Sequence, residues 1–193
     1  MLFVLCHVSF MHIPRKLLVV ILLTFIWFSA GHCTKPESEK ILFDFESDSE
    51  LDRFHWECHT LFSLSDEHAV HGKKSLKLEL FPSDYPGLTP MLASNNWRGY
   101  KVFSFDVYSA QQKVIPLTIR IDDNKNYPDY PDRYNKTFYL QPGANTISVP
   151  INMLITSGTN RKLNLKTIYS VLIFTAKPNK KVVLYFDYIR LTR

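Results

Sequence analysis

The stretch Leu117-Thr-Ile-Arg-Ile-Asp-Asp-Asn-Lys-Asn-Tyr-Pro-Asp-Tyr-Pro-Asp-Arg-Tyr-Asn135 begins as a strand and continues as a loop rich in proline and tyrosine. Successive side chains of a strand point to opposite faces of the sheet. Leu117, Ile119 and Ile121 therefore share one face, and Arg120 and Asp122 share the other. This alternation predicts a strand with one buried face, followed by a polar loop.

The same alternation recurs along the chain. In 73–80 the leucines alternate with Lys77 and Glu79, and in 101–109 Phe103 and Phe105 alternate with polar residues. Further short strands are predicted over 41–46, 55–64, 137–140, 146–151, 171–176 and 182–191, with turn signals between them and no long amphipathic helix. This pattern predicts an all-β fold, a β-sandwich or jelly roll.

Local signals predict several details of this sandwich. Pro142 and Gly143 predict a turn that joins 137–140 to 146–151 as a hairpin. Short helical turns are expected in 47–54, with Ser47 or Ser49 as the cap, and in 163–169. The prolines between residues 82 and 90 predict a long loop, and the two terminal strands are expected to lie close together.

The first 33 residues are predicted to stand apart from the fold. Arg15 and Lys16 precede an apolar run, 17–28, which is followed by small residues. This predicts a signal peptide or an N-terminal membrane anchor, with Met1 or Met11 as the start. Residues 34–40 then form a linker and 41–193 the β-sandwich domain. The expected location is extracytoplasmic: secreted, periplasmic or tethered to a membrane.

The cysteines and the net charge narrow the class of protein further. Ala-Gly-His-Cys33 resembles a bacterial lipoprotein cleavage box; otherwise Cys33 and Cys58 can pair as a disulfide in an oxidising compartment. The sequence contains no C-x-x-C pair, which disfavours a metal site built on the cysteines. Without residues 1–33, which contain two basic and no acidic residues, the charge is 21 − 18 = +3. The lysines are scattered, which disfavours nucleic acid as a partner.

A set of motifs in a fixed order resembles a known family. The chain resembles the galactose-binding-like β-sandwiches and, more narrowly, the jelly-roll carbohydrate-binding modules attached to glycoside hydrolases, over residues 41–191. The motifs are Phe43-Asp-Phe-Glu46, Val70-His-Gly-Lys-Lys-Ser-Leu76, Trp97-Arg-Gly-Tyr-Lys-Val-Phe-Ser-Phe-Asp-Val-Tyr108, Gln141-Pro-Gly-Ala-Asn145 and Leu184-Tyr-Phe-Asp-Tyr-Ile-Arg-Leu191. The resemblance implies a carbohydrate partner, by analogy of fold.

The resemblance also implies a structural Ca²⁺. Its ligands would be Glu46, backbone carbonyls near His71 to Lys73, and Asp187. Six to eight hard oxygen ligands of this kind suit Ca²⁺. The alternative is that Asp187 caps a neighbouring backbone segment or pairs with a basic side chain, which satisfies a buried carboxylate equally well.

The polar sides of two predicted strands supply candidate ligand-binding residues. Asp106 and Tyr108 lie on one strand, and Arg120 and Asp122 on the other; if both strands belong to one sheet, these groups converge on one face. Carboxylates and a guanidinium would bind sugar hydroxyls, and a tyrosine ring would cover a pyranose. The loop residues expected to form the rim are Tyr127, Tyr130, Arg133 and Tyr134. The alternatives are a solvated ion pair on the sheet and a loop that covers a sheet edge.

Three functions remain open on this evidence. The first is a non-catalytic, extracytoplasmic module that binds a poly- or oligosaccharide on a concave sheet face. The second is a protein-interaction or scaffold domain of the cell envelope, and the third a glycan-active hydrolase or lyase. For the third, an acid/base pair would come from Asp122, Asp123, Asp129 and Asp132. No G-x-S-x-G, P-loop or H-E-x-x-H motif is present.

Overall fold

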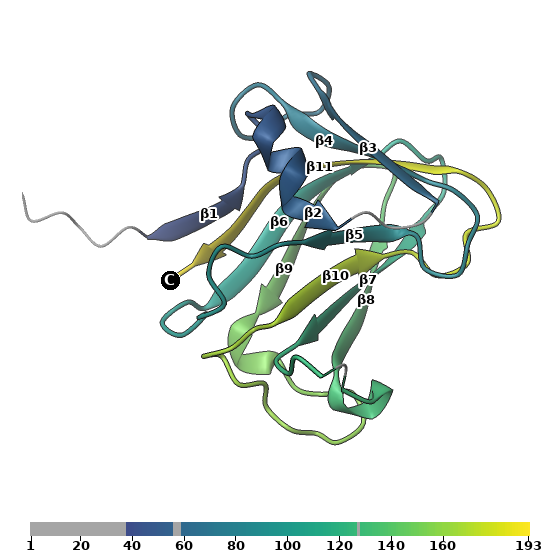
Figure 1. Cartoon of the computed structure of the whole chain (residues 1–193). Helices are drawn as coiled ribbons and strands as arrows, with labels where there is room; N and C mark the ends of the chain where they lie inside the picture. Colours follow the sequence, from purple (N-terminus) through teal and green to yellow (C-terminus); the bar gives the residue numbers. More distant parts are fainter. Residues whose placement is uncertain (1–37, 56–58, 127) are drawn as a thin grey trace, which may run out of the picture. The chain divides into compact units, whose positions relative to one another are not determined.

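The computed structural model describes residues 38–55, 59–126 and 128–193. In this part of the chain, eleven strands form two antiparallel sheets that pack face to face (Figure 1). The six-stranded sheet has the order β3-β4-β11-β6-β9, with β1 paired to β11, and the five-stranded sheet has the order β2-β5-β10-β7-β8. The predicted all-β sandwich is confirmed.

The bounds of the elements follow the alternating segments of the sequence. The six-stranded sheet contains β1 (Glu39–Phe43), β3 (Thr60–Ser65), β4 (Ser75–Leu80), β6 (Val102–Ser109), β9 (Gly143–Pro150) and β11 (Val182–Thr192). The five-stranded sheet contains β2 (Phe54–His55), β5 (Gly87–Pro90), β7 (Ile115–Asp122), β8 (Tyr134–Leu140) and β10 (Ser170–Phe174). Three short 3₁₀ helices complete the described chain: η1 (Asp48–Arg53), η2 (Tyr130–Asp132) and η3 (Ile151–Met153).

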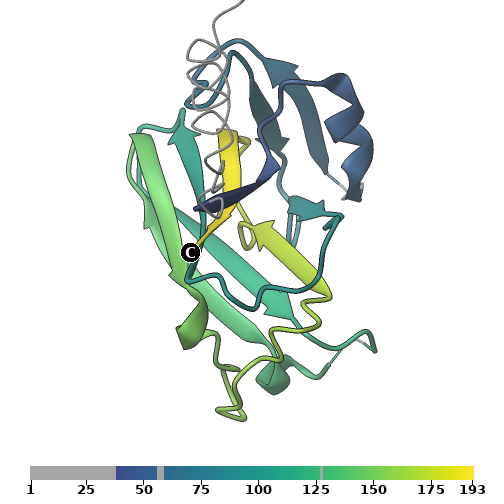
Figure 2. The same ribbon diagram turned by 90° about the vertical axis from the view of Figure 1, so that its left-hand side faces the viewer.

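Two local predictions near the termini are confirmed. The expected helical turn is η1, whose cap Ser47 accepts a hydrogen bond from the backbone N–H of Ser49. The terminal strands are neighbours, because β1 pairs with the end of β11 (Figure 2). Glu39 already pairs with Thr192, so the first strand begins before residue 41. Among the described residues, no helix is long and apolar enough to cross a membrane.

The predicted hairpin of β8 and β9 is wrong. β8 pairs with β7 in one sheet, whereas β9 pairs with β6 in the other. The turn between them does have the expected geometry, since Gly143 has a φ of 88°. The Asn145 side chain also hydrogen-bonds the backbone of Gln141 at 2.8 Å. Turn residues specify a change of direction but not the partner of the next strand, and here the chain crosses between sheets.

Other predicted boundaries also shift. The segment 55–64 is divided between β2 and β3, which belong to different sheets, and its residues 56–58 lie outside the described part. No helix forms over 163–169. The predicted long loop contains β5, which lies so close to β10 that a Cβ on Gly87 would stand 2.3 Å from the carbonyl oxygen of Ile173. The proline-rich segment predicted to be a loop therefore contains a short strand.

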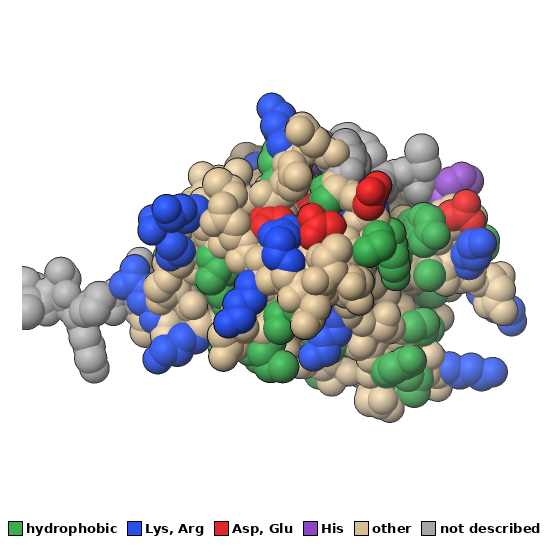
Figure 3. All heavy atoms as spheres, turned by 90° about the horizontal axis from the view of Figure 1, so that it is seen from below, with side chains coloured by type: hydrophobic (Ala, Val, Ile, Leu, Met, Phe, Trp, Pro, Cys, Tyr) green, Lys and Arg blue, Asp and Glu red, His purple; other side chains and the backbone are tan. Residues whose placement is uncertain are grey.

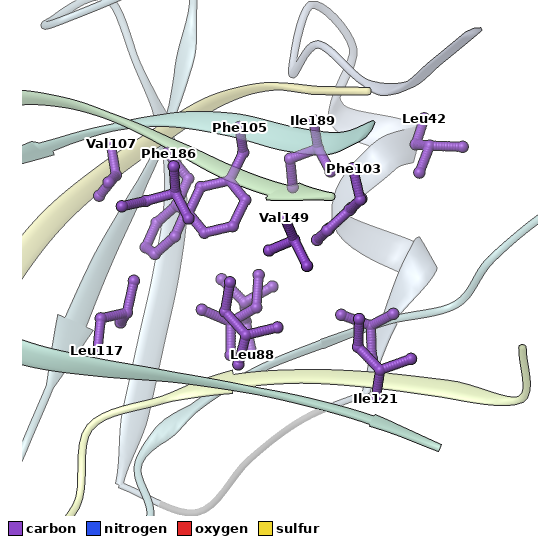
Figure 4. Close-up of a cluster of buried hydrophobic side chains, with 14 of the residues drawn as sticks. Leu42, Leu88, Phe103, Phe105, Val107, Leu117, Ile121, Val149, Phe186 and Ile189 are labelled. Carbon is purple, nitrogen blue, oxygen red and sulfur yellow. The ribbon is translucent and has the colours of Figure 1, made fainter. Parts of the chain in front are cut away.

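The core lies between the two sheets (Figure 4). Phe103, Phe105 and Phe186 point inward from the six-stranded sheet, and Leu117 and Ile121 point inward from the five-stranded sheet; all are at most 1% exposed. Burying each such side chain contributes about 1.5–3 kcal/mol. The apolar side of every alternating strand is used in this way, so the polar sides form the two outer faces of the sandwich.

Candidate functional site

The predicted ligand-binding residues are divided between the two outer faces. Asp106 and Tyr108 lie on β6, in the six-stranded sheet, whereas Arg120 and Asp122 lie on β7, in the five-stranded sheet. The expectation that these four side chains converge on one face is therefore wrong. Alternation within a strand shows which of its side chains share a face, but it does not show to which sheet the strand belongs.

Arg120 and Asp122 form a close ion pair on the five-stranded sheet. Nε of Arg120 lies 2.9 Å and Nη2 lies 2.7 Å from Oδ2 of Asp122. The two residues are two positions apart on one strand, so both side chains project from the same face. The aspartate side chain is 6% exposed and the arginine side chain 18% exposed, so the guanidinium covers the carboxylate.

Two hollows on this face are neighbours. Arg120 and Leu172 line both, and we call the two hollows together the Arg120 groove. The first hollow is also lined by His55, Thr89, Asp122, Asn124, Lys125, Tyr169 and Ser170. The second is also lined by Tyr85, Tyr130, Arg133, Asn135 and Phe174.

The sheet register explains why these residues share the groove. Arg120 stands opposite Leu172 on β10 and opposite Asn135 on β8, and Asp122 stands opposite Ser170. Residues directly opposite each other in a sheet point to the same face. The groove floor is thus built by three adjacent strands of one rigid sheet.

Exposed tyrosines stand along the Arg120 groove. Tyr130 is 67% exposed, Tyr85 59% and Tyr169 45%. Tyr85 packs edge-on against Phe174, with ring centroids 5.5 Å apart. Such rings combine an apolar face with a polar hydroxyl. Around a buried ion pair they offer both stacking surface and hydrogen-bond donors to a polar, ring-shaped molecule.

Only some of the loop residues predicted to form the rim lie beside Arg120 and Asp122. Tyr130 and Arg133 line the groove with Arg120 and Asp122, whereas Tyr127 lies outside the described residues. Tyr134 is buried, and burial raises its pKa to about 12. The sequence prediction missed Tyr85, Tyr169 and His55, because they come from segments whose position depends on long-range strand pairing.

The other two predicted ligand residues are bound by their own neighbours. Asp106 accepts hydrogen bonds from Thr146 Oγ1 at 2.6 Å and from Arg190 Nη1 at 2.8 Å. The ring of Tyr108 lies under the imidazole of His68, with centroids 3.5 Å apart and planes at 8°. A hollow beside them is lined by these residues, but both carboxylate oxygens of Asp106 and one ring face of Tyr108 are already engaged.

The predicted calcium residue Asp187 binds backbone N–H groups. Its Oδ2 accepts from Val70 at 2.6 Å and His71 at 2.8 Å, and its Oδ1 accepts from Tyr188 at 2.6 Å. Burial raises the pKa of this carboxyl, and the N–H donors partly oppose the rise. Asp187 as a whole residue is 1% exposed. These hydrogen bonds therefore satisfy a carboxylate that would otherwise be costly to bury.

Glu46 binds the same turn from the other side. Its Oε1 accepts from the backbone N–H groups of Lys73 at 2.7 Å and Lys74 at 2.8 Å, and these bonds lower its pKa. Gly72 has a φ of 74°, and a Cβ there would stand 2.4 Å from the Glu46 carboxyl carbon. The positive φ is what favours glycine at this position.

This turn does not fit a Ca²⁺ site as it stands. Both carboxylates face N–H donors, whereas Ca²⁺ takes oxygen ligands. Within the described part of the chain, no three His, Cys, Asp or Glu side chains are grouped to hold a metal. Calcium binding stays a prediction of the family resemblance. A melting temperature that is the same in calcium and in chelator would remove it.

Beside the Arg120 groove, Arg161 joins two carboxylates. Its guanidinium lies 2.7 Å from Asp123 and 2.9 Å from Asp132. Hydrogen bonds from Arg161 lower the pKa of both carboxyls, so neither is suited to donate a proton near neutral pH. Figure 3 shows how acidic side chains gather in a few places on the molecule seen from below, whereas basic side chains are spread over it.

Comparison with solved structures identifies the architecture. A family 11 carbohydrate-binding module from Clostridium thermocellum, in complex with a β-1,3-1,4-mixed-linked tetrasaccharide, superposes with a TM-score of 0.62 at 18% identity. The match covers 80% of this chain and 95% of that module. The chain has the fold of a jelly-roll carbohydrate-binding module. The family resemblance read from the ordered motifs is thereby confirmed at the level of fold.

Parts of larger enzymes share this architecture. An exo-β-agarase matches with a TM-score of 0.65 at 15% identity, over 79% of this chain and 25% of the agarase. A Clostridium thermocellum xylanase 10B fragment with its CBM22-1 and GH10 modules, complexed with xylohexaose, matches with a TM-score of 0.54 at 15% identity, over 81% of this chain and 29% of that chain. No protein-family model matches the sequence, and no curated protein matches it either.

Proposed function

We propose that this chain is a non-catalytic carbohydrate-binding module that holds its glycan in the Arg120 groove. The observation that carries the proposal is the presence of two neighbouring hollows at Arg120, which is ion-paired to Asp122 and flanked by exposed tyrosines. The fold shared with carbohydrate-binding modules supports it. An N-terminal signal or anchor in residues 1–33 would place this module outside the cytoplasm.

The Arg120 groove provides both kinds of contact that a sugar needs. The Nη1 group of Arg120 makes none of the hydrogen bonds to Asp122, so its N–H groups remain available to another partner. A guanidinium presents such donors in a fixed, planar arrangement. Tyr169 adds an aromatic ring to the first hollow and Tyr130 adds one to the second. A pyranose can therefore be hydrogen-bonded at its edge and covered on its face.

The non-catalytic part of the proposal is supported by the state of the nearby carboxylates. Asp122 is bound to Arg120, and Asp123 and Asp132 are both bound to Arg161. Glycoside hydrolysis commonly needs one carboxyl that is protonated and one that is free to act as base or nucleophile. All three carboxylates are engaged in ion pairs, and Arg161 lowers the pKa of Asp123 and of Asp132.

Affinity electrophoresis tests the proposal directly. The full chain is run through gels that contain mixed-linkage β-glucan, xylan, agarose or polygalacturonate, with a mild detergent throughout. We expect at least one polysaccharide to retard the chain, and Tyr130→Ala or Tyr169→Ala to weaken that binding about tenfold, as for a central aromatic contact. Tyr139→Ala is the matched control, because Tyr139 is 69% exposed and lines neither hollow.

Two results would contradict the proposal. Absence of retardation in every gel would remove carbohydrate binding, and a co-purifying envelope protein would then favour an interaction domain. Release of reducing sugar from any of the same polysaccharides would overturn the non-catalytic assignment.

A further inference from the structure

Basic side chains outnumber acidic side chains in the lining of the Arg120 groove. The lining contains three basic side chains, Arg120, Lys125 and Arg133, and a single carboxylate, Asp122. That carboxylate lies 2.7 Å from Arg120 Nη2, so these two charges neutralise each other. The uncompensated charge of the groove is therefore that of Lys125 and Arg133.

Neither of these two cations has a carboxylate partner. Within the described residues, the ion pairs involve neither Lys125 nor Arg133. Lys125 is exposed in the first hollow. Arg133 lines the second hollow, and its Nε donates to the backbone carbonyl of Pro128, which leaves both terminal amino groups for other partners. Each hollow thus holds, besides Arg120, one cation that has no carboxylate partner.

The acidic residues next to the groove are directed elsewhere. Asp123 and Asp132 lie in an adjoining hollow, which shares Asn124, Lys125 and Tyr169 with the groove. All four of their carboxylate oxygens accept hydrogen bonds, from Arg161, from the backbone N–H of Asn164 and from Thr159. Their oxygens are satisfied without Lys125.

We infer that the glycan bound in the Arg120 groove is anionic, and that it carries carboxylate or sulfate groups which Lys125 and Arg133 contact. This inference rests on the proposed carbohydrate-binding function. A guanidinium binds carboxylate or sulfate oxygens with two parallel hydrogen bonds, and these charge-assisted bonds are stronger than bonds to a neutral hydroxyl. A neutral glycan would use the tyrosines and Arg120 but would leave both unpaired cations in water.

Isothermal titration of the full chain with matched pairs of polysaccharides tests the inference. One pair is polygalacturonate and its fully methyl-esterified form; the other is a sulfated carrageenan and its desulfated form. We expect one anionic member to bind at least about tenfold more tightly than its neutral counterpart at about 0.05 M salt, because charge pairs of this kind are weakly screened there. The advantage should shrink severalfold at about 0.5 M salt. The pair that shows it distinguishes carboxylate from sulfate.

Charge-removing variants locate the effect. Lys125→Gln and Arg133→Gln should each weaken binding of the anionic polysaccharide about threefold to tenfold, as expected for loss of one charge-assisted contact, and should weaken binding of the neutral member less. The matched control is Lys101→Gln, because Lys101 is an exposed lysine before β6 in the other sheet. All three positions are at least partly exposed, so the fold should tolerate each change.

The outcomes separate this inference from the function on which it rests. Equal affinity for charged and neutral members, with the same salt dependence, overturns the anionic assignment and leaves carbohydrate binding intact. Preference for the anionic members that Lys101→Gln reduces as much as Lys125→Gln does would show general attraction by the net charge and would overturn the assignment to the groove. Absence of binding to all four polysaccharides overturns the anionic assignment, and it removes carbohydrate binding only if the β-glucan, xylan and agarose gels also show no retardation.

Discussion

The two outer faces of this sandwich each hold an arginine–aspartate pair beside a hollow, but neighbouring side chains engage one pair more fully than the other. On the six-stranded sheet, Arg190 lies 2.8 Å from Asp106, and on the five-stranded sheet Arg120 lies 2.7 Å from Asp122. The exposed fractions are similar, at 15% and 12% for the first pair and 18% and 6% for the second. Residue type and burial therefore do not distinguish the two.

The surroundings of the two pairs differ. Arg190 also donates to the carbonyl of Tyr188 and lies 4.0 Å from the centroid of its ring, while Thr146 occupies the other oxygen of Asp106. Around Arg120 the aromatic side chains are instead exposed and have open space between them. The comparison teaches that a polar cluster stabilises the fold when its neighbours complete it, and can bind a ligand when they do not.

The largest expected effect is a loss of folding stability when Asp187, on β11 of the six-stranded sheet, is replaced. Asp187→Ala removes the acceptor of three backbone N–H groups in a buried site, so it should lower the free energy of unfolding by about 3 kcal/mol or more. Urea unfolding measures the change, and Asp187→Asn, which keeps one oxygen, should cost less. A loss below about 1 kcal/mol would show that the turn does not depend on this carboxylate.

Next, Asp106→Ala should separate stability from binding. The change leaves the partly buried Arg190 without its carboxylate, which should cost about 2 kcal/mol of unfolding free energy. Retardation in the polysaccharide gels should be unchanged, provided that the gels are run where the variant is folded. Loss of glycan binding with little loss of stability would move the site to the six-stranded sheet and break the comparison.

Replacing one tyrosine on each face should have smaller effects: one change should lower stability only, and the other should weaken glycan binding only. Tyr108→Ala removes the ring that stacks on His68 and should cost about 1 kcal/mol of stability with no effect on glycan binding. Tyr169→Ala, at an exposed position in the Arg120 groove, should change stability by less than about 0.5 kcal/mol and weaken binding. Thermal unfolding and affinity electrophoresis on the same samples distinguish the two, and a reversed pattern would contradict the assignment of faces.

The smallest effect is a pH dependence beside the Arg120 groove. Arg161 lowers the pKa of Asp123 and Asp132 in the folded state. The stabilisation is therefore complete above their unfolded pKa of about 3.9, and it is lost as the pH falls through the lower folded values. Unfolding of the unmodified chain and of Arg161→Gln should differ at pH 6 and converge toward pH 2. A constant difference over this range would show that the contribution of Arg161 is not ionic.

Much of the fold could be predicted from local signals. The alternation correctly predicts that Leu117, Ile119 and Ile121 face the core, and the ordered motifs predict the jelly roll. Turn chemistry at Gly143 is also predicted correctly. What failed was the assignment of strands to sheets, because pairing between distant segments depends on the whole chain and not on the residues of either strand.

The candidate site shows the same division. Arg120 and Asp122 could be predicted as neighbours, since spacing on one strand fixes their direction. Tyr85 and Tyr169 could not, because each reaches the groove from a segment next to a different strand. Asp106 and Tyr108 carried an equally suggestive pattern, and only the positions of Arg190 and His68 show that they are already bound.

The most direct test of the central claim is a map of the surface that a glycan perturbs. Backbone amide chemical shifts of the ¹⁵N-labelled chain are followed by NMR during titration with oligosaccharides of the polysaccharide that retards it most. The account predicts the largest shifts in β7 and β10, at Arg120, Asp122 and Leu172, and at Tyr130. Shifts confined to β6 and β11, around Asp106 and Tyr185, would contradict it.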